Sequence, residues 1–335
     1  MNDKASMPLV SVICTAYNHE KYIRKCLDGF VMQKTTFPFE VIVHDDASTD
    51  HTADIIMEYA KKYPQIIRPI IQKENQYSQK IRIGDNYMYP IARGKYCALC
   101  EGDDYWIDPY KLQKQAEALE SHPDCQMCVG KAVTVYEDGT PGPSVFPKQQ
   151  LQTGVISSRE FLKMAFSYSF HTSSYFYKTS QYRKLIDEMP EFKKQAPVGD
   201  QVYLLYYGQL GPIYYINDAL SVYRMNSIAG WSASNRASSE EKQIDHQKKM
   251  INMYNLYDQY TGQKYHDLCQ MGIRKREFEI LRIKGDYRGQ LSRQFKDVFV
   301  NLPKDYQRKV VIASFFPKIA KRIQNQRKEK RAMRA

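Results

Sequence analysis

The chain has 335 residues, of which 43% are hydrophobic, so it can bury one large core or one core and a smaller appendage. Its net charge of +12 is uneven: residues 1–235 contain 25 basic and 26 acidic residues, whereas residues 236–335 contain 24 and 11. A basic excess confined to the last hundred residues argues against nucleic acid as a partner of the whole protein, and it indicates a boundary near residue 235.

No stretch reaches the roughly 20 consecutive apolar residues of a membrane span, and no apolar segment follows the first residues as a secretory signal. We therefore expect a cytoplasmic protein. The seven cysteines include two C-x-x-C pairs, at 97–100 and 125–128, a spacing found in zinc sites. Each pair lies in an apolar run typical of a strand, where residues three apart face opposite sides. We therefore expect buried thiols rather than zinc ligands or disulfides.

In chain order, continuous apolar runs predict strands at residues 9–15, 39–44, 66–71 and 95–100. Helices are predicted at 20–32, at 50–63 with Asp50 as N-cap, around 85–92, and from Pro109 to residue 120. This alternation is typical of an α/β fold with a mostly parallel central sheet flanked by helices. A Gly/Pro turn at 139–143, a helix near 158–166, a strand near 173–177 and a helix after Gly199 follow. Residues 236–335 are predicted to be mostly helical.

Three polar clusters each follow a predicted strand: Tyr17-Asn18, Asp45-Asp46 and residues 101–104 (EGDD). Ligands of such sheets bind beyond the carboxyl ends of the strands, so we expect all three clusters at one crevice. The adjacent carboxylates of residues 101–104 repel one another unless a cation is present, and Mg²⁺ or Mn²⁺ held this way commonly binds phosphate oxygens. The alternative is a solvated acidic turn before the helix that begins near Pro109.

Residues 11–18 (SVICTAYN), 41–50 (VIVHDDASTD) and 101–106 (EGDDYW) resemble, in order and spacing, the family 2 glycosyltransferases of the GT-A fold. The resemblance covers about residues 8–235. It implies a GT-A catalytic domain at 1–235, with nucleotide-sugar binding at about 8–110 and the acceptor side at about 125–235. The basic, helical extension at 236–335 follows it.

The resemblance also implies a reaction. It would be an inverting, metal-assisted transfer of a sugar from a nucleotide-diphosphate donor, usually a UDP-sugar, to a hydroxyl of a glycan or lipid-linked acceptor. The setting would be bacterial cell-surface polysaccharide biosynthesis, such as capsule or lipopolysaccharide assembly.

Residue roles follow from the matching motifs. By resemblance, Thr15 and Asp46 contact the base and ribose of the nucleotide, and Tyr17 packs nearby. A carboxylate that accepts hydrogen bonds from the base and the ribose hydroxyls is chemically reasonable. The alternative for Asp46 is an electrostatic partner for the N-terminus of the next helix.

The metal, Mn²⁺ or Mg²⁺, is assigned to Asp103 and Asp104 by resemblance, and Asp103 also belongs to the donor-binding set. Glu101 replaces the family's commoner leading aspartate, and Asn226 stands where many relatives have histidine. We treat both as further candidate ligands.

Asp200 is the candidate catalytic base. On its sequence alone, Asp200 reads as the N-cap of the helix that follows Gly199, whereas the resemblance implies that it deprotonates the acceptor hydroxyl.

Five further residues are candidates for contact with the substrates. Lys80, Arg82 and Arg224 are candidates to approach the diphosphate of the donor. His171 and Trp231 are candidates for the acceptor side. The alternative for Lys80 and Arg82 is a solvated basic turn. The alternatives for His171 and Trp231 are a structural histidine and a tryptophan of the core.

The C-terminus combines an apolar stretch with a basic one. Residues 310–316 (VVIASFF) precede residues 318–334, which contain eight basic residues and one acidic residue. This pattern fits peripheral contact of residues 310–335 with an anionic membrane, at the inner face of the cell membrane. A solvated terminus is the alternative.

Two rival functions stay open. A sugar nucleotidyltransferase usually carries a glycine-rich basic signature after the first strand, and none follows residues 9–18. A nucleotide-sugar-binding protein without transfer activity would keep the donor site and lack the base. A nicotinamide dehydrogenase is excluded because the first strand is not followed by G-x-G-x-x-G.

Overall fold

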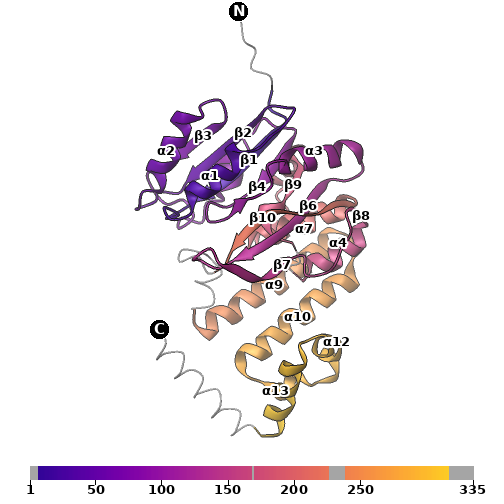
Figure 1. Cartoon of the computed structure of the whole chain (residues 1–335). Helices are drawn as coiled ribbons and strands as arrows, with labels where there is room; N and C mark the ends of the chain where they lie inside the picture. The colour runs from indigo at the N-terminus through magenta and orange to yellow at the C-terminus, as the bar shows by residue number, and fades with distance from the viewer. Residues whose placement is uncertain (1–6, 168–169, 226–237, 317–335) are drawn as a thin grey trace, which may run out of the picture. The chain divides into compact units, whose positions relative to one another are not determined.

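The computed structural model describes residues 7–167, 170–225 and 238–316 (Figure 1). The chain separates into two compact units, Met1–Lys194 with Val198–Arg236, and Gln195–Pro197 with Ala237–Ala335. None of the helices in the described ranges has the length and apolarity needed to span a bilayer.

The first unit is built on a ten-stranded sheet. Its strands are β1 (Val10–Ala16), β2 (Phe39–Asp45), β3 (Ile67–Ile71), β4 (Tyr96–Leu99), β5 (Tyr105–Trp106), β6 (Met127–Val135), β7 (Pro141–Phe146), β8 (Gly154–Ile156), β9 (Phe176–Lys178) and β10 (Ile213–Arg224). Their order is β3-β2-β1-β4-β9-β6-β10-β5, with β7 on β6 and β8 on β10. β1 to β4, β6 and β10 run in one direction and the remaining strands run against them, so the sheet is mostly parallel, as predicted.

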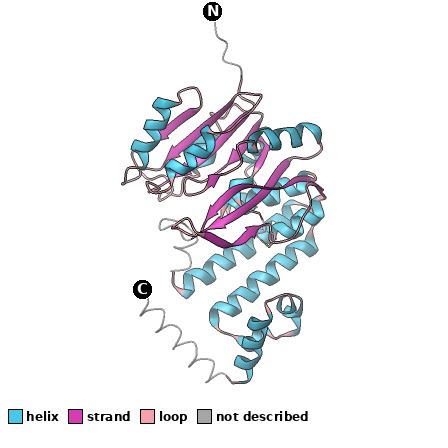
Figure 2. Ribbon diagram, viewed as in Figure 1, coloured by secondary structure: helices cyan, strands magenta, loops and turns pink. Residues whose placement is uncertain are grey.

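Helices cover this sheet on both faces (Figure 2). They are α1 (Ile23–Val31), α2 (Thr52–Lys62), η1 (Gly84–Met88), α3 (Lys111–Ser121), α4 (Ser158–Ala165), η2 (Thr172–Ser174), α5 (Thr179–Glu188), α6 (Glu191–Lys194) and α7 (Gly199–Leu210). The helix predicted around 85–92 is only the short π-helical turn η1. The N-cap position of α2 is His51, so the prediction of Asp50 as N-cap is wrong by one residue, although Asp50 Oδ1 accepts the Thr52 amide at 3.0 Å.

The central strands are buried on both faces because alternate side chains enter two different layers. Val10, Val12 and Cys14 of β1 join the core formed with α1, α2 and α3. On the opposite face the core is rich in tyrosines: Tyr89, Tyr177, Tyr182 and Tyr207 are buried, and the partly buried Tyr203 packs with them.

All seven cysteines are buried and free, as the sequence predicted. Cys100 belongs to the layer that contains α1, whereas the Cys97 thiol lies 3.2 Å from the Thr179 hydroxyl at the start of α5. The two sulfurs of this C-x-x-C pair therefore point into different layers and do not share a metal.

The second unit is helical, as predicted. Its elements are α9 (Glu240–Tyr260), α10 (His266–Lys284), α11 (Tyr287–Gln290), η3 (Arg293–Phe295), α12 (Lys296–Val300) and α13 (Lys304–Phe315). α9 and α10 pack against each other and bury Met253, Tyr257 and Cys269.

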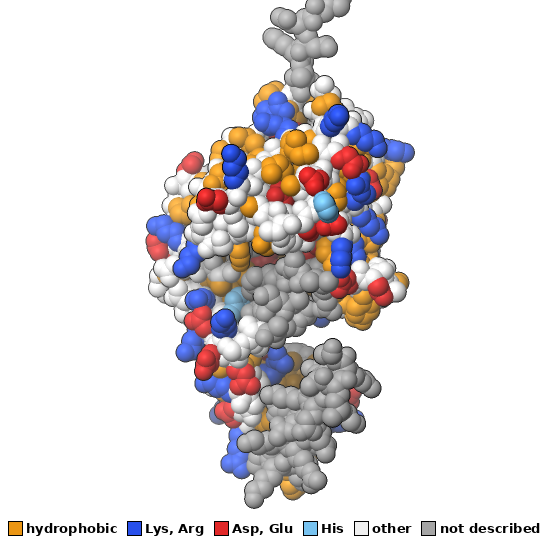
Figure 3. Space-filling model, turned by 90° about the vertical axis from the view of Figure 1, so that its left-hand side faces the viewer, with side chains coloured by type: hydrophobic (Ala, Val, Ile, Leu, Met, Phe, Trp, Pro, Cys, Tyr) orange, Lys and Arg blue, Asp and Glu red, His pale blue; other side chains and the backbone are white. Residues whose placement is uncertain are grey.

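The surface of the first unit carries charges of both signs. On the face seen in Figure 3, Lys and Arg side chains are interspersed with Asp and Glu. This distribution agrees with the nearly equal numbers of basic and acidic residues in residues 1–235.

Candidate functional site: an acidic turn in a nucleotide-sized cavity

A cavity of about 580 Å³ opens where β1, β2 and β4 end. Side chains from all three polar clusters line it, together with residues from the loop after β3. The lining residues are Thr15, Ala16, Tyr17, His19, Asp46, Asn75, Tyr77, Ser78, Ile83, Glu101 and Asp103. The parallel strands therefore bring the predicted clusters to one crevice.

The acidic turn, residues 101–104, is attached to the end of β1. The Cys100 amide donates to the Ile13 carbonyl at 3.2 Å, and the Gly102 amide donates to the Thr15 carbonyl at 2.9 Å. Only glycine fits at 102, because a Cβ there would lie 2.8 Å from His19 Nδ1. This close approach fixes the carboxylates at the cavity wall.

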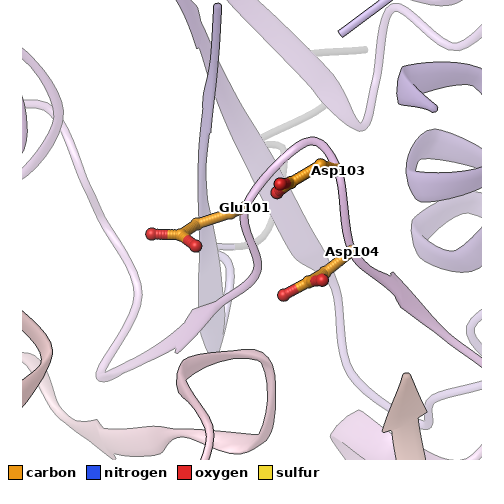
Figure 4. Close-up of side chains that lie close together, drawn as sticks. All are labelled: Glu101, Asp103 and Asp104. Atoms are coloured by element: carbon orange, nitrogen blue, oxygen red, sulfur yellow. The ribbon is translucent and has the colours of Figure 1, made fainter. Parts of the chain in front are cut away.

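The three carboxylates of the acidic turn project to the same side (Figure 4), and one oxygen of each lies within 4.8 Å of the others. Burial and the charges of Asp103 and Asp200 raise the pKa of Glu101 to about 8, although this side chain reaches solvent. Burial, with Asp103 and Glu101, also raises the pKa of Asp104 well above its usual range. The cluster is therefore electrostatically unfavourable without a counter-charge.

A hard divalent cation fits this cluster. The donor set contains only carboxylate oxygens, which Mg²⁺ and Mn²⁺ prefer. Asp104 Oδ1 accepts the Arg224 amide at 2.9 Å, whereas the buried Asp104 Oδ2 has no hydrogen bond within the described ranges. A buried carboxylate oxygen without a partner is unusual, and a bound cation would satisfy it.

Arg224 forms hydrogen bonds with the acidic turn. Its side chain is buried, and its Nε donates to the Asp103 carbonyl at 3.1 Å. The guanidinium lies over the rings of Tyr22 and Tyr105, with Cζ 4.8 and 5.6 Å from their centroids. Arg224 does not line the cavity. In the structure Arg224 contacts the acidic turn, and its contact with the diphosphate of a donor stays a prediction.

Asp46 organises the opposite wall of the cavity. Its two carboxylate oxygens accept the amides of Gln76 and Tyr77 at 2.8 and 3.0 Å, and its carbonyl accepts the Asn75 side chain at 3.0 Å. These bonds hold the loop after β3 against the end of β2. The alternative role at the N-terminus of α2 belongs to Asp50, whose carboxylate accepts the Thr52 amide.

Asp200 lies in the first turn of α7, and its Oδ1 accepts the Gln201 amide at 2.6 Å. Val198 occupies the N-cap position, so the prediction of Asp200 as N-cap is wrong. The charge of Asp200 contributes, after burial and the charge of Asp103, to the raised pKa of Glu101.

The basic residues at 80 and 82 do not line the cavity. Lys80 is exposed and has a left-handed backbone, with φ of 63°. Arg82 Nη2 donates to the carbonyls of Lys193 and Lys194, each at 2.6 Å, and so ties the segment before η1 to α6.

His171, suggested for the acceptor side, lies beside the acidic turn. Its Nδ1 is 3.6 Å from Asp104 Oδ2 and 2.9 Å from the Ser173 hydroxyl, and its ring stacks on Tyr223. Burial lowers the pKa of His171 to about 4, so at neutral pH this contact joins a neutral imidazole to Asp104. Asn226 and Trp231 lie outside the described residues.

Sequence reasoning missed several cavity residues. His19 directly follows the Tyr17-Asn18 cluster, and that position was a usable signal. Asn75, Tyr77 and Ser78 lie in a loop without a recognisable pattern. Asp46 brings that loop to the cavity through backbone hydrogen bonds that a sequence does not reveal.

Residues 11–184, more than half of the chain, match the family model described as Glycosyl transferase family 2. The chain belongs to this family. It is 45% identical over 160 residues to an uncharacterized protein of Mycobacterium tuberculosis, a match that covers 46% of this chain and 44% of that protein. It is 34% identical over 134 residues to the putative teichuronic acid biosynthesis glycosyltransferase TuaG of Bacillus subtilis, covering 40% and 50%. The matches thus span about half the length of these relatives.

Among solved structures, S. aureus TarS 1–349 in complex with UDP-GlcNAc superposes with a TM-score of 0.54 at 20% identity. The superposition covers 91% of this chain and 79% of TarS 1–349. This family 2 protein therefore has the GT-A fold, as the sequence motifs implied.

Proposed function

We propose that this protein is an inverting glycosyltransferase that moves a sugar from a nucleotide-diphosphate donor to a hydroxyl of a glycan or lipid-linked acceptor. The observation that carries the proposal is the convergence of the polar ends of β1 and β2 with the acidic turn in one cavity. Such a cavity offers hydrogen-bonding groups to a nucleoside and carboxylates to the cation that accompanies a diphosphate. Membership of glycosyl transferase family 2 supports the same reaction class.

Glu101, Asp103 and Asp104 would hold Mn²⁺ or Mg²⁺, with Asn226 as a further candidate ligand. When bound, the ion supplies positive charge that stabilises the departing nucleoside diphosphate. Thr15 and Tyr17 are assigned to the nucleoside. Asp46 keeps free lone pairs on both oxygens for the base or ribose while it holds the loop after β3.

Asp200 is proposed as the base. As the acceptor oxygen forms its bond to the anomeric carbon, the acceptor proton moves to the Asp200 carboxylate and the bond to the diphosphate oxygen breaks with its electron pair. The influence of Asp200 on the pKa of Glu101 supports this role, because the donor sugar is attached to the diphosphate that the acidic turn would face.

The donor and acceptor classes rest on weaker support. We propose a UDP-sugar donor, because TarS, which shares the fold, was solved with UDP-GlcNAc. We propose a role in cell-surface polysaccharide assembly, because TuaG is named for teichuronic acid biosynthesis.

Peripheral contact with an anionic membrane through residues 310–335 would bring the enzyme to a lipid-linked acceptor. Exposed apolar side chains on α13 support this contact: Val311, Ile312 and Phe315, with Phe315 72% exposed. They lie beside the exposed, basic Arg308 and Lys309.

The proposal predicts that Asp104→Asn and Asp200→Asn fail in different ways. Calorimetric titration with UDP, GDP, dTDP and CMP sugars and Mn²⁺ identifies the donor, and release of nucleoside diphosphate by slow donor hydrolysis reports bond cleavage. Loss of a residue that only supports a metal ligand typically costs roughly 10- to 100-fold in metal affinity. Because Asp104 is proposed as a ligand itself, Asp104→Asn should weaken metal-dependent donor binding by more than this. Asp200→Asn should bind the donor normally and release nucleotide about 10² to 10⁴-fold more slowly.

Asp54→Asn is the matched control, because Asp54 lies on α2 with its side chain 80% exposed. Full turnover by Asp200→Asn would remove the assigned base. Donor binding by the wild-type protein without any turnover would indicate a nucleotide-sugar-binding protein instead.

A further inference from the structure

His19 is rigidly held at the end of β1. Its amide donates to the Thr52 hydroxyl at 2.8 Å, and its carbonyl accepts the amides of Tyr22 and Ile23, each at 2.8 Å. The residue is only 9% exposed. The direction of its imidazole is therefore set by the backbone and by packing.

The two ring nitrogens of His19 have different surroundings. Nδ1 is buried and has no hydrogen-bond partner among the residues that the structure describes, and it packs against Gly102, where a Cβ would lie 2.8 Å away. Nε2 is not among the buried polar atoms that lack a partner, and the residue lines the cavity. Of the two ring nitrogens, we therefore take Nε2 as the one that can reach a ligand in the cavity.

This arrangement determines which nitrogen carries the proton. A buried N–H without an acceptor is destabilising, and nothing in the described part of the chain accepts a hydrogen bond at Nδ1. We therefore assign the proton to Nε2. Burial lowers the pKa of His19, and the charges of Asp103, Asp50 and Asp45 act against this shift.

We propose that His19 is a donor-binding residue that donates its Nε2–H to a phosphate oxygen of the nucleoside diphosphate. The inference rests on the proposed function. His19 shares the cavity wall with Glu101 and Asp103 and contacts the turn between them, so the ligand group nearest to Nε2 is the one that faces the cation. In a nucleotide-sugar, that group is the diphosphate.

Two substitutions separate the nitrogens. The amide nitrogen of His19→Gln reaches the position of Nε2, whereas that of His19→Asn reaches only the position of Nδ1. Calorimetry with uridine, UMP and UDP in the presence of Mn²⁺ compares a ligand without phosphate with ligands that carry one or two.

We expect His19→Asn to lose about 10-fold or more of the UDP affinity while it keeps its uridine affinity, since one hydrogen bond to a charged group is lost. His19→Gln should bind UDP within about threefold of the wild-type protein. His51→Asn, an exposed histidine on the neighbouring helix, is the matched control.

Unchanged UDP binding by His19→Asn would overturn the inference and leave the proposed function standing. Equal losses of uridine and UDP affinity would also overturn it, because a collapsed cavity would then explain both. Wild-type protein that binds no nucleoside diphosphate would instead overturn the proposed function, and this inference with it.

Discussion

Lys111 is a completely buried lysine, and no carboxylate of the described residues forms an ion pair with its amino group. Its Nζ donates to Gln115 Oε1 at 2.6 Å and lies 4.0 Å from the centroid of the Trp106 ring. Burial lowers the pKa of Lys111 from 10.5 to about 7. Lys111 therefore links the stability of the fold to pH.

We predict that Lys111→Met flattens this pH dependence. Between pH 7 and 10.5 the unfolded chain keeps the lysine proton that the folded chain has lost, so the unfolded state binds more protons and stability rises with pH. The slope from this one group approaches about 1.4 kcal/mol per pH unit. Urea unfolding of both proteins at pH 7, 8 and 9 measures it. Parallel profiles for the two proteins would contradict the lowered pKa.

At the residue scale, some site residues could be predicted and others could not. The acidic turn could be predicted, because carboxylates that are adjacent in sequence stay adjacent in any fold. The position of Arg224 could not be predicted, because Tyr22 and Tyr105 come together around its guanidinium only in the folded chain. For His19 the signal was its position directly after the Tyr17-Asn18 cluster, although a lone histidine is usually structural.

At the scale of elements, the loop after β3 is joined to α5 and α6 by a buried ion pair. Asp85 in η1 lies 2.7 Å from Lys193 Nζ, and both side chains are less than a tenth exposed. Tyr182 donates to the other Asp85 oxygen at 3.0 Å. Arg82 also donates a hydrogen bond to the Lys193 carbonyl. Together these contacts connect the loop after β3 and η1 to α6, which precedes α7.

We predict that breaking this pair with Lys193→Met destabilises the protein by about 3–5 kcal/mol, because Asp85 is left buried without a counter-charge. The double variant Asp85→Asn, Lys193→Met should recover most of the loss. Lys184→Met is the control, since the pair of Lys184 with Glu188 is exposed and contributes less than about 1 kcal/mol. Chemical denaturation measures all of these variants, and additive losses in the double variant would contradict the coupling.

The main elements of the sheet could be predicted because β1 to β4 each carry their own apolar run. The strands β5 and β10 could not be predicted from their own sequence. β5 has two residues, and it exists only through its pairing with Ser221 and Val222 of β10. β10 itself is irregular where it pairs with β6. Such strands are defined by their partners rather than by a local pattern.

At the scale of the whole molecule, net charge distinguishes the two parts of the chain. Residues 1–235 are nearly neutral, and the basic excess lies in the helical unit and the terminus that follows it. The exposed apolar side chains of α13 lie at the start of the most basic stretch. A membrane surface would bind both features together.

We predict that the protein co-sediments with vesicles that contain phosphatidylglycerol and not with pure phosphatidylcholine. Removal of the last twenty residues should reduce binding more than tenfold, since each basic residue near an anionic surface contributes about 1 kcal/mol. Phe315→Ser should weaken binding less, and Tyr77→Ser, an exposed aromatic in the first unit, serves as control. Equal sedimentation with and without the terminus would contradict membrane contact.

The pairing of β5 with β10 also determines when the site can form during synthesis. Asp104 and Arg224, which the structure joins by a hydrogen bond, are 120 positions apart in the chain. At ribosomal rates of about 5–20 residues per second, Arg224 is synthesised on the order of ten seconds after the acidic turn. A nascent chain that already contains β1, β2 and β4 therefore has the carboxylates but not the strand that fixes them. The acidic turn gains this anchor only after the last strand of the sheet has left the ribosome.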